Sequence, residues 1–326
     1  MIMRRLKLVP EKTNIDFFKI AGVTFGGSVV LTIASIVLFF AVGLNYGIDF
    51  KGGTTIRVQS QQPINVGKFR NALQPLKLGD VMITQVFDPN FGAEKHVAMV
   101  RVQAQNGQQS ITPQTTHEIE AALKKVDNTV TFPSIESVGP KVSQELIKTA
   151  LLSVVVAVAA IIFYIWLRFE WQFAMGAVAA TVHDVALTIG IFVVFQLKFD
   201  LSIVAAILTI VGYSINDTVV VFDRARENLI KYKKMPLRDL LNLSANETLS
   251  RTVMTSGTTL IALIALLVLG GDVIRNFVFA MTWGIVVGTY SSIYVAKNIV
   301  LMVGVKRDWS KPTDKGAGTQ FSKGKV

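Results

Sequence analysis

Long apolar segments alternate with polar ones along most of this chain, and the spacing of the apolar segments predicts a membrane protein. Six of them are long enough to cross a hydrocarbon core of about 30 Å as helices. They are expected at residues 20–44, 149–167, 172–196, 199–222, 251–270 and 275–304. The pattern therefore predicts an α-helical integral membrane protein with six transmembrane helices.

The polar segments divide the rest of the chain. We expect an N-terminus at 1–19, a separate domain at 45–148, a five-helix transmembrane region at 149–304 with a basic loop at 223–250, and a basic tail at 305–326. The first apolar segment follows a basic start, as a signal peptide does, but it is too long for a cleaved signal and is interpreted as an anchor. Because the N-terminus, the basic loop and the tail are all rich in Lys and Arg, both termini are expected to be cytoplasmic. The long segment 45–148 is exempt from that rule and is expected to be exported.

The exported segment alternates strand and helix signals in the order β-α-β-β-α-β, which is typical of a small ferredoxin-like α+β domain. Thr112 is a plausible N-cap for its second helix, with Pro113 at the first helical position. Its acidic residues are scattered and form no catalytic constellation. The sequence therefore predicts a binding role for this domain and no enzymatic activity.

Composition agrees with a membrane protein, since 51% of the residues are hydrophobic and 17% are charged, against about 25% charged in soluble domains. The formal net charge of +11 lies mainly in loops on one side of the membrane, so it does not indicate nucleic-acid binding. The chain has no cysteine, three histidines without metal-ligand spacing, and no P-loop. Neither a metal nor a nucleotide cofactor is expected.

Two full charges stand inside the predicted spans, Asp217 in the fourth and Arg251 at the start of the fifth. Ionisable residues in spanning helices cost roughly 2.5 to 3.5 kcal/mol and usually have a partner and a task. By helical geometry Asp217 shares a polar arc with Tyr213 and Asn216, and Arg251 shares one with Thr255. Asp217 could bind and release a proton, since burial disfavours its charged form and Arg251 favours it. The alternative is a static ion pair that fixes helix register.

The third predicted span carries His183 and Asp184 near its middle. His183 could relay protons because its reference pKa lies near neutrality. Equally, both side chains could hydrogen-bond to neighbouring helices, and, as adjacent helical residues, they need not contact each other. On the sixth span Gly284, Gly288, Ser291 and Ser292 form a small-residue stripe that indicates close helix packing.

Several motifs, in order along the chain, resemble the SecF proteins of the SecD/SecF family of protein-export membrane subunits. They are GIDFKGGT, ESVGPKVSQEL, RFEWQFAMGAVAATVHD, ILTIVGYSINDTVVVFDRARENL, NETLSRTVMTSGTTL and GTYSSIYVA. The resemblance runs from about residue 43 to 300 and shows no departure at the charged positions.

The resemblance implies a subunit of the Sec export machinery in a bacterial inner membrane, paired with SecD, associated with the SecYEG channel and with YajC, and acting on unfolded exported polypeptides. It also implies use of the proton-motive force, with Asp217 and Arg251 on the proton path, and kinship with resistance-nodulation-division transporters. Asp49, Gly52 and Gly53 match the family's hinge between the first span and the exported domain, although a tight turn opening a strand is the alternative for the glycines.

Two other functions remain open on the residues alone. One is a half-size proton-coupled efflux or lipid transporter, which would need an apolar substrate cavity in the exported domain. The other is a non-energised scaffold for the channel or for an insertase, in which Asp217 and Arg251 are structural.

Overall fold

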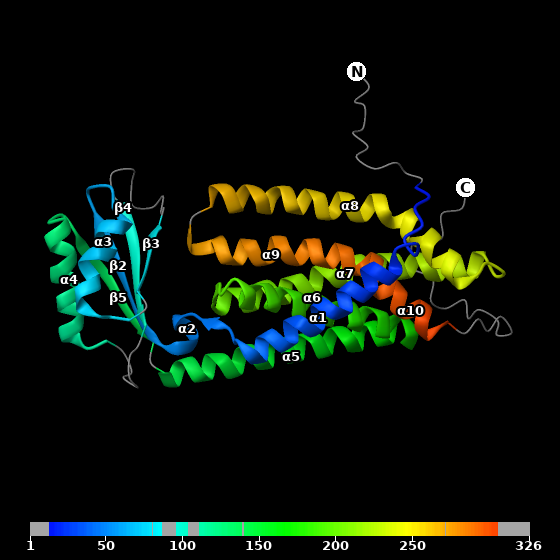
Figure 1. Ribbon diagram of the computed structural model, residues 1–326, viewed down its shortest axis with the longest axis horizontal. Coiled ribbons are helices and arrows are strands. Elements are labelled where there is room, and N and C mark those ends of the chain that lie inside the picture. The colour runs from blue at the N-terminus through cyan, green and yellow to red at the C-terminus, as the bar shows by residue number, and fades with distance from the viewer. Residues whose placement is uncertain are drawn as a thin grey trace, which may run out of the picture.

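The computed structural model describes residues 13–79, 81–86, 96–103, 111–138, 140–270 and 272–305. A bundle of long helices carries a small α+β unit at one end (Figure 1). Residues 1–12 of the predicted N-terminus and residues 306–326 of the predicted basic tail lie outside the described chain.

Six helical segments of the described chain are long and apolar enough to span a membrane, as the sequence predicts. They are α1 (Ala21–Ala41), α5 (Pro140–Arg168), α6 (Trp171–Val194), α7 (Leu201–Lys231), α8 (Leu237–Leu269), and a composite helix of α9 (Asp272–Ser291), the π-helical turn η3 (Ser292–Ala296) and α10 (Lys297–Val303).

The basic segment 223–250, expected to be a loop, is mostly helical. α7 continues to Lys231 and α8 begins at Leu237, so only residues 232–236 connect them. Polar side chains join the two helices here: Arg224 Nε donates to Glu247 Oε2 at 2.7 Å, and Asn228 Nδ2 donates to Ser244 Oγ at 3.0 Å. Apolar periodicity marks only the membrane-crossing part of such helices, which explains why the sequence ended α7 too early and began α8 too late.

α7 lies at the centre of the bundle and packs closely against α9. A Cβ atom on Gly284 would lie 2.4 Å from the Ile210 side chain, and one on Gly288 would lie 3.0 Å from Ser214. These two glycines therefore serve packing, as predicted for the small-residue stripe. By contrast, α1 and α5 are mostly exposed, apolar helices at the edge of the bundle.

The α+β unit follows the predicted order of elements. β2 (Gly53–Ser60), α3 (Val66–Leu73), the short 3-10 turn η1 (Gln74–Leu76), β3 (Val81–Val86), β4 (His96–Gln103), α4 (Pro113–Val126) and β5 (Thr131–Val138) form it. Its antiparallel sheet has the order β3-β4-β2-β5. The predicted cap is present, since Thr112 Oγ1 accepts from Thr115 N at 3.2 Å.

The unit is joined to the bundle through a short two-stranded pairing. β1 (Asn45–Tyr46) and β6 (Lys198–Phe199) run parallel, and α2 (Ile48–Lys51) follows β1. The Phe50 ring stacks on Phe199 with centroids 6.0 Å apart. Residues 45–51, which we call the root of the α+β unit, are therefore attached to β6, the segment that leads into α7.

At the other end of the bundle, residues 13–20 form what we call the N-terminal strap, an irregular segment held against α8. Asn246 accepts from Ile15 N at 2.8 Å and donates to Ile15 O at 2.8 Å, while Asn242 accepts from Phe17 N at 3.0 Å. These bonds satisfy backbone groups just ahead of α1.

Charged and aromatic groups complete the strap. Arg238 bonds Asp16 at 2.8 Å and lowers the pKa of the Asp16 carboxyl. The buried Lys297 ammonium lies 4.4 Å from the ring centroids of both Phe17 and Phe18. Aromatic faces attract such a cation, so this contact holds the strap against α10.

Candidate functional site within the helix bundle

Asp217 is buried where α7, α8 and α9 meet. Only 2% of it is exposed. Ser256 Oγ on α8 donates to Asp217 Oδ2 at 3.3 Å and also lies 2.7 Å from Thr289 Oγ1 on α9. A carboxylate with one long hydrogen bond at a buried position is poorly solvated, and ionisable residues in spanning helices usually have a function.

Arg251 does not pair with Asp217 in this structure. Arg251 is exposed on α8, and among the described residues no ion pair within 4.0 Å joins it to Asp217. It nevertheless lies within electrostatic range of the Asp217 carboxylate. The static ion pair considered as an alternative from the sequence is therefore not formed.

Among the described residues, no hydrogen bond or ion pair joins Asp217 to Asn216 or Thr255, predicted for the proton path, or to Tyr213, predicted to relay protons or to pack. Asn216 is exposed, and Thr255 Oγ1 donates to carbonyl oxygens of its own helix, with Arg251 O at 3.1 Å. Tyr213 reaches α8 instead, with its hydroxyl 3.3 Å from Thr259 Oγ1.

Sequence reasoning missed Ser256, which bonds Asp217, and Thr289, which bonds Ser256. The predicted arc of α8 ran through Arg251 and Thr255, but the buried polar face of that helix runs through Thr252 and Ser256. The i, i+4 spacing of Thr252 and Ser256 is the sequence signal that could have revealed this buried face. These two residues form one of two polar stripes on α8.

Other polar residues of α8 and of α7 are exposed. We define the exposed polar stripe as Thr209 and Asn216 of α7 together with Arg251 and Thr258 of α8. An arginine and an asparagine facing hydrocarbon would each be costly, so this face requires a partner or a wet cavity in the membrane.

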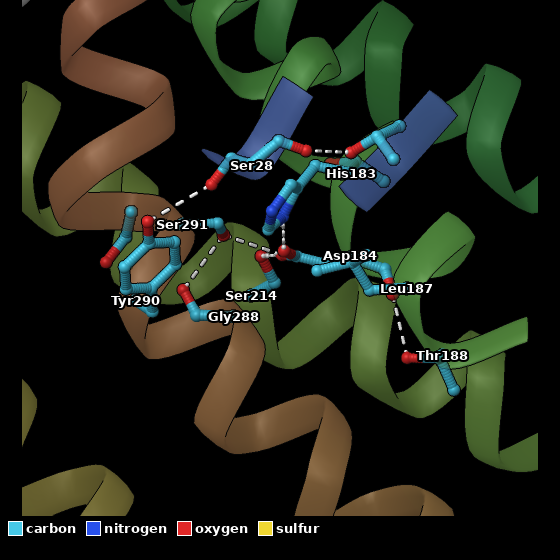
Figure 2. Close-up of polar contacts among 12 residues, drawn as sticks. Ser28, His183, Asp184, Leu187, Thr188, Ser214, Gly288, Tyr290 and Ser291 are labelled. Atoms are coloured by element: carbon cyan, nitrogen blue, oxygen red, sulfur yellow. Dashed lines mark hydrogen bonds and ion pairs between the residues drawn. The ribbon is translucent and has the colours of Figure 1, made fainter. Parts of the chain in front are cut away.

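A second buried carboxylate, Asp184 on α6, contacts α7 and α9 through hydroxyl groups (Figure 2). Its Oδ1 is 2.8 Å from His183 Nδ1, and its Oδ2 accepts from Ser214 Oγ at 2.5 Å and from Ser291 Oγ at 2.8 Å. The two neighbouring residues on α6 thus contact each other, which helical spacing alone did not require. Asp184 joins α6 to both α7 and α9.

Tyr290 extends this polar cluster to α1. Its ring stacks on His183 with centroids 6.2 Å apart. The Tyr290 hydroxyl donates to Thr24 O at 2.8 Å and accepts from Ser28 Oγ at 3.1 Å. Ser28 is the buried residue of an otherwise exposed α1, so the contact fixes where that helix lies.

The predicted hinge residues have separate roles. Asp49 Oδ2 accepts from Leu201 N at 3.1 Å, so Asp49 fixes the root to the start of α7. Gly52 has a φ of 78°, which favours glycine. Gly53 needs its glycine for a different reason, because a Cβ atom there would lie 2.4 Å from Val102 O of β4.

No group of three or more His, Cys, Asp or Glu side chains that could hold a metal ion occurs in the part of the chain that the structure describes. The two buried carboxylates instead contact hydroxyl groups and one imidazole. Hydroxyls and imidazole exchange protons, and this is the chemistry that the arrangement supports.

Comparison with known proteins agrees with the motifs. The C-terminal model of the protein export membrane proteins SecD/SecF matches residues 118–306, and the SecD/SecF GG motif matches residues 37–64. The protein translocase subunit SecF of Cereibacter sphaeroides is 65% identical over 98% of both chains. The protein translocase subunit SecDF of Brucella abortus is 39% identical over 96% of this chain and 40% of its own.

Solved structures give the same answer. A crystal structure of SecDF from Thermus thermophilus, described as a translocon-associated membrane protein, is similar with a TM-score of 0.75 and 36% identity over 91% of this chain. SecDF in a super-membrane-facing form matches with a TM-score of 0.70 and 37% identity. The chain spans about 40% of the length of these solved chains.

Proposed function

Because this chain belongs to the SecD/SecF family, as a multi-pass SecF-type translocation subunit, we propose that it works with SecD to drive late steps of protein export with the proton-motive force. Asp217 binds and releases the proton. The single observation that carries this proposal is a buried carboxylate held by one long hydrogen bond at the junction of three helices.

The exposed polar stripe supports SecD as the partner in the membrane. SecF and SecD are parts of one chain in the SecDF relatives. A SecD helix bundle lying over Asn216 and Arg251 would remove both from lipid and would bring Arg251 and the Asp217 site into a shared interior. The proton path then runs along the boundary of the two subunits.

α7 supplies a rigid link between the proton site and the α+β unit. Asp49 bonds the first residue of α7, and Asp217 lies about 24 Å further along the same helix, at 1.5 Å per residue. A proton-dependent shift of α7 therefore moves the root of the unit directly. Since Asp49 and Phe50 are fixed to the bundle, Gly52 is the position about which the ferredoxin-like unit swings.

The energy available is sufficient for such a device. One charge crossing a potential of 100 mV releases about 2.3 kcal/mol, and a few kcal/mol shift a two-state equilibrium substantially. The cycle needs no metal, nucleotide or enzymatic step.

The α+β unit lies on the exported side of a bacterial inner membrane in this proposal, with both termini in the cytoplasm. There it binds unfolded polypeptides weakly as they leave the SecYEG channel, with YajC as a further associate. A role of this kind requires a surface that releases its substrate in each cycle.

The test is Asp217→Asn in a complex with SecD, assayed for proton-dependent export in vesicles. The isostere keeps the shape but cannot titrate, so export driven by the proton gradient is expected to disappear while abundance and SecD association persist. Asp223→Asn is the matched control, because Asp223 lies on the same helix but is part-exposed and bonded to Arg168 at 3.0 Å. Normal export with Asp217→Asn would leave the scaffold function standing and would end the proposal.

A further inference from the structure

Asp184 is the most completely buried carboxylate of the described bundle whose function remains unassigned. None of it is exposed, and 3% of His183 is. Three polar side chains contact it at 2.8 Å or less, which is the number of donors that a charged carboxylate accepts well. Asp184 is therefore held in a complete set of hydrogen bonds, and the packing of apolar helices does not by itself require a buried carboxylate.

The same heavy atoms also satisfy a protonated Asp184. Ser291 Oγ lies 2.8 Å from Asp184 Oδ2 and 3.1 Å from Gly288 O. With Asp184 charged, the single Ser291 hydroxyl hydrogen points to Oδ2. With Asp184 protonated on Oδ2, the acid donates to Ser291 Oγ, and Ser291 turns its hydrogen to Gly288 O. No helix has to move between the two states.

His183 offers a second position for the same proton. Its Nδ1 bonds Asp184, while its Nε2 is buried and has no hydrogen-bond partner in the described chain. A buried nitrogen without a partner costs roughly 1 to 3 kcal/mol. A proton on Nε2 would form an imidazolium directly beside the Asp184 carboxylate, so the pair holds one added proton on either residue.

The cluster lies next to Asp217 on α7. Ser214, which bonds Asp184, is one helical turn from Asp217, about 4.5 Å nearer the end of α7 that carries the α+β unit. Thr218, one turn beyond Ser214 and beside Asp217, has a buried hydroxyl without a partner in the described chain. The face of α7 between the two carboxylates is therefore polar.

We propose that His183 and Asp184 form a second proton-binding site, on the α+β side of Asp217, that exchanges its proton with the Asp217 site along this face of α7. The exchange rests on the proposed function of Asp217, whereas proton binding at Asp184 does not. The proton moves between Asp184 Oδ2 or His183 Nε2 and an Asp217 carboxylate oxygen, and the total charge of the two sites is conserved.

Few other charges surround the pair. Among the described residues, Ser214 of α7 and Ser291 of α9 bond Asp184, and Tyr290 of α9 stacks on His183 and bonds Ser28 of α1. Asp217 lies one helical turn from Ser214 on α7. The Lys297 ammonium on α10 lies instead against the rings of the N-terminal strap. Changes of charge at the pair therefore depend mainly on the proton itself and on Asp217.

The experiment is infrared difference spectroscopy of the complex with SecD between acidic and alkaline pH, which detects the carbonyl band of each protonated carboxyl group. We expect Asp184→Asn to remove one titrating band and Asp217→Asn to remove a different one, while Asp223→Asn removes neither. Ser291→Ala keeps the carboxylate but takes away the acceptor of the protonated form. It is expected to shift the Asp184 band, and it provides a test if Asp184→Asn does not fold.

The outcomes separate the two claims. If neither Asp184→Asn nor Ser291→Ala alters the titrating bands, the second site does not exist, whatever Asp217 does. A titrating Asp184 band together with normal export by Asp217→Asn would refute the proposed function and keep the second site. If both bands exist but neither shifts when the other carboxyl group is replaced, exchange between the sites is refuted.

Discussion

The N-terminal strap should open when one asparagine is removed. Asn246→Ala deletes two hydrogen bonds. In one, Ile15 N donates to Asn246 Oδ1 at 2.8 Å, and in the other, Asn246 Nδ2 donates to Ile15 O at 2.8 Å. A typical intramolecular hydrogen bond contributes about 1 kcal/mol net. Asn242 Nδ2 still donates to Ile15 O at 2.9 Å, and because Ile15 is 47% exposed, water can bond its free N–H, so no additional penalty for a buried unpaired group is expected.

The loss is therefore roughly 2 kcal/mol in the free energy of opening, which corresponds to about a 30-fold increase in the population of the open strap. Amide hydrogen exchange of the complex measures it at Phe17, whose hydrogen bond to Asn242 is kept in the variant, so that its exchange follows that population. Phe17 N bonds Asn242 and not Asn246, so its exchange reports whether the strap opens as one unit.

Asn276→Ala is the matched control. Asn276 also holds a backbone carbonyl, with Nδ2 donating to Lys198 O at 3.2 Å, but at the other end of the bundle. It should leave exchange at Phe17 unchanged. If exchange at Phe17 in Asn246→Ala stays within about twofold of the wild-type rate, the strap is held by the aromatic and ionic contacts, and the hydrogen-bond reasoning is wrong.

Three further predictions concern other parts of the molecule. Arg251→Met should reduce proton-dependent export by at least about tenfold, or ~1.4 kcal/mol, and Arg251→Lys by less because Lys keeps the charge; equal export by the two would show that the charge is not used. Gly53→Val should destabilise the α+β unit by roughly 1 to 3 kcal/mol, because the new side chain clashes with Val102 O. Gly52→Ala should destabilise it by about 1 kcal/mol because of the positive φ at that position. Denaturation of the complex measures both effects. Burial raises the pKa of the Asp127 carboxyl, but donors from Ser60 and Thr129 outweigh it, so the pKa is lowered. The stability that Asp127 provides is therefore present above the unfolded pKa of about 3.9 and is lost as pH falls through the lower folded value; Asp127→Asn should abolish that part of the pH dependence in thermal melts.

The sequence predicts the parts of this fold that depend on local pattern. Apolar length predicts six spans, period-2 and helical signals predict the element order of the α+β unit, and Asp217 is found because a charge in a span is rare. The ends of α7 and α8 were misjudged because the pairs Arg224–Glu247 and Asn228–Ser244 extend the two helices beyond the apolar pattern. Contacts between helices leave no such periodic signal.

The N-terminal strap shows the same limit more sharply. A sequence reader sees Asn242, Asn246 and Lys297 as polar residues at the ends of spans and has no reason to connect them with Phe17, more than 200 positions away. Only the packing of α8 and α10 beside the start of α1 brings them together, and the result is a contact that positions a mostly exposed helix.

The helical wheel could not show that Arg251 and the residues contacting Asp217 lie on different polar surfaces of α8. It treats a polar arc as one surface, yet α8 has two polar stripes, a buried one through Ser256 that contacts Asp217 and an exposed one through Arg251. A bundle that buries one stripe and leaves the other in the membrane is incomplete as a structure. Packing against a SecD bundle, as proposed above, would complete it and make both stripes interior, and for that reason Arg251 and Asp217 are best tested in the two-subunit complex.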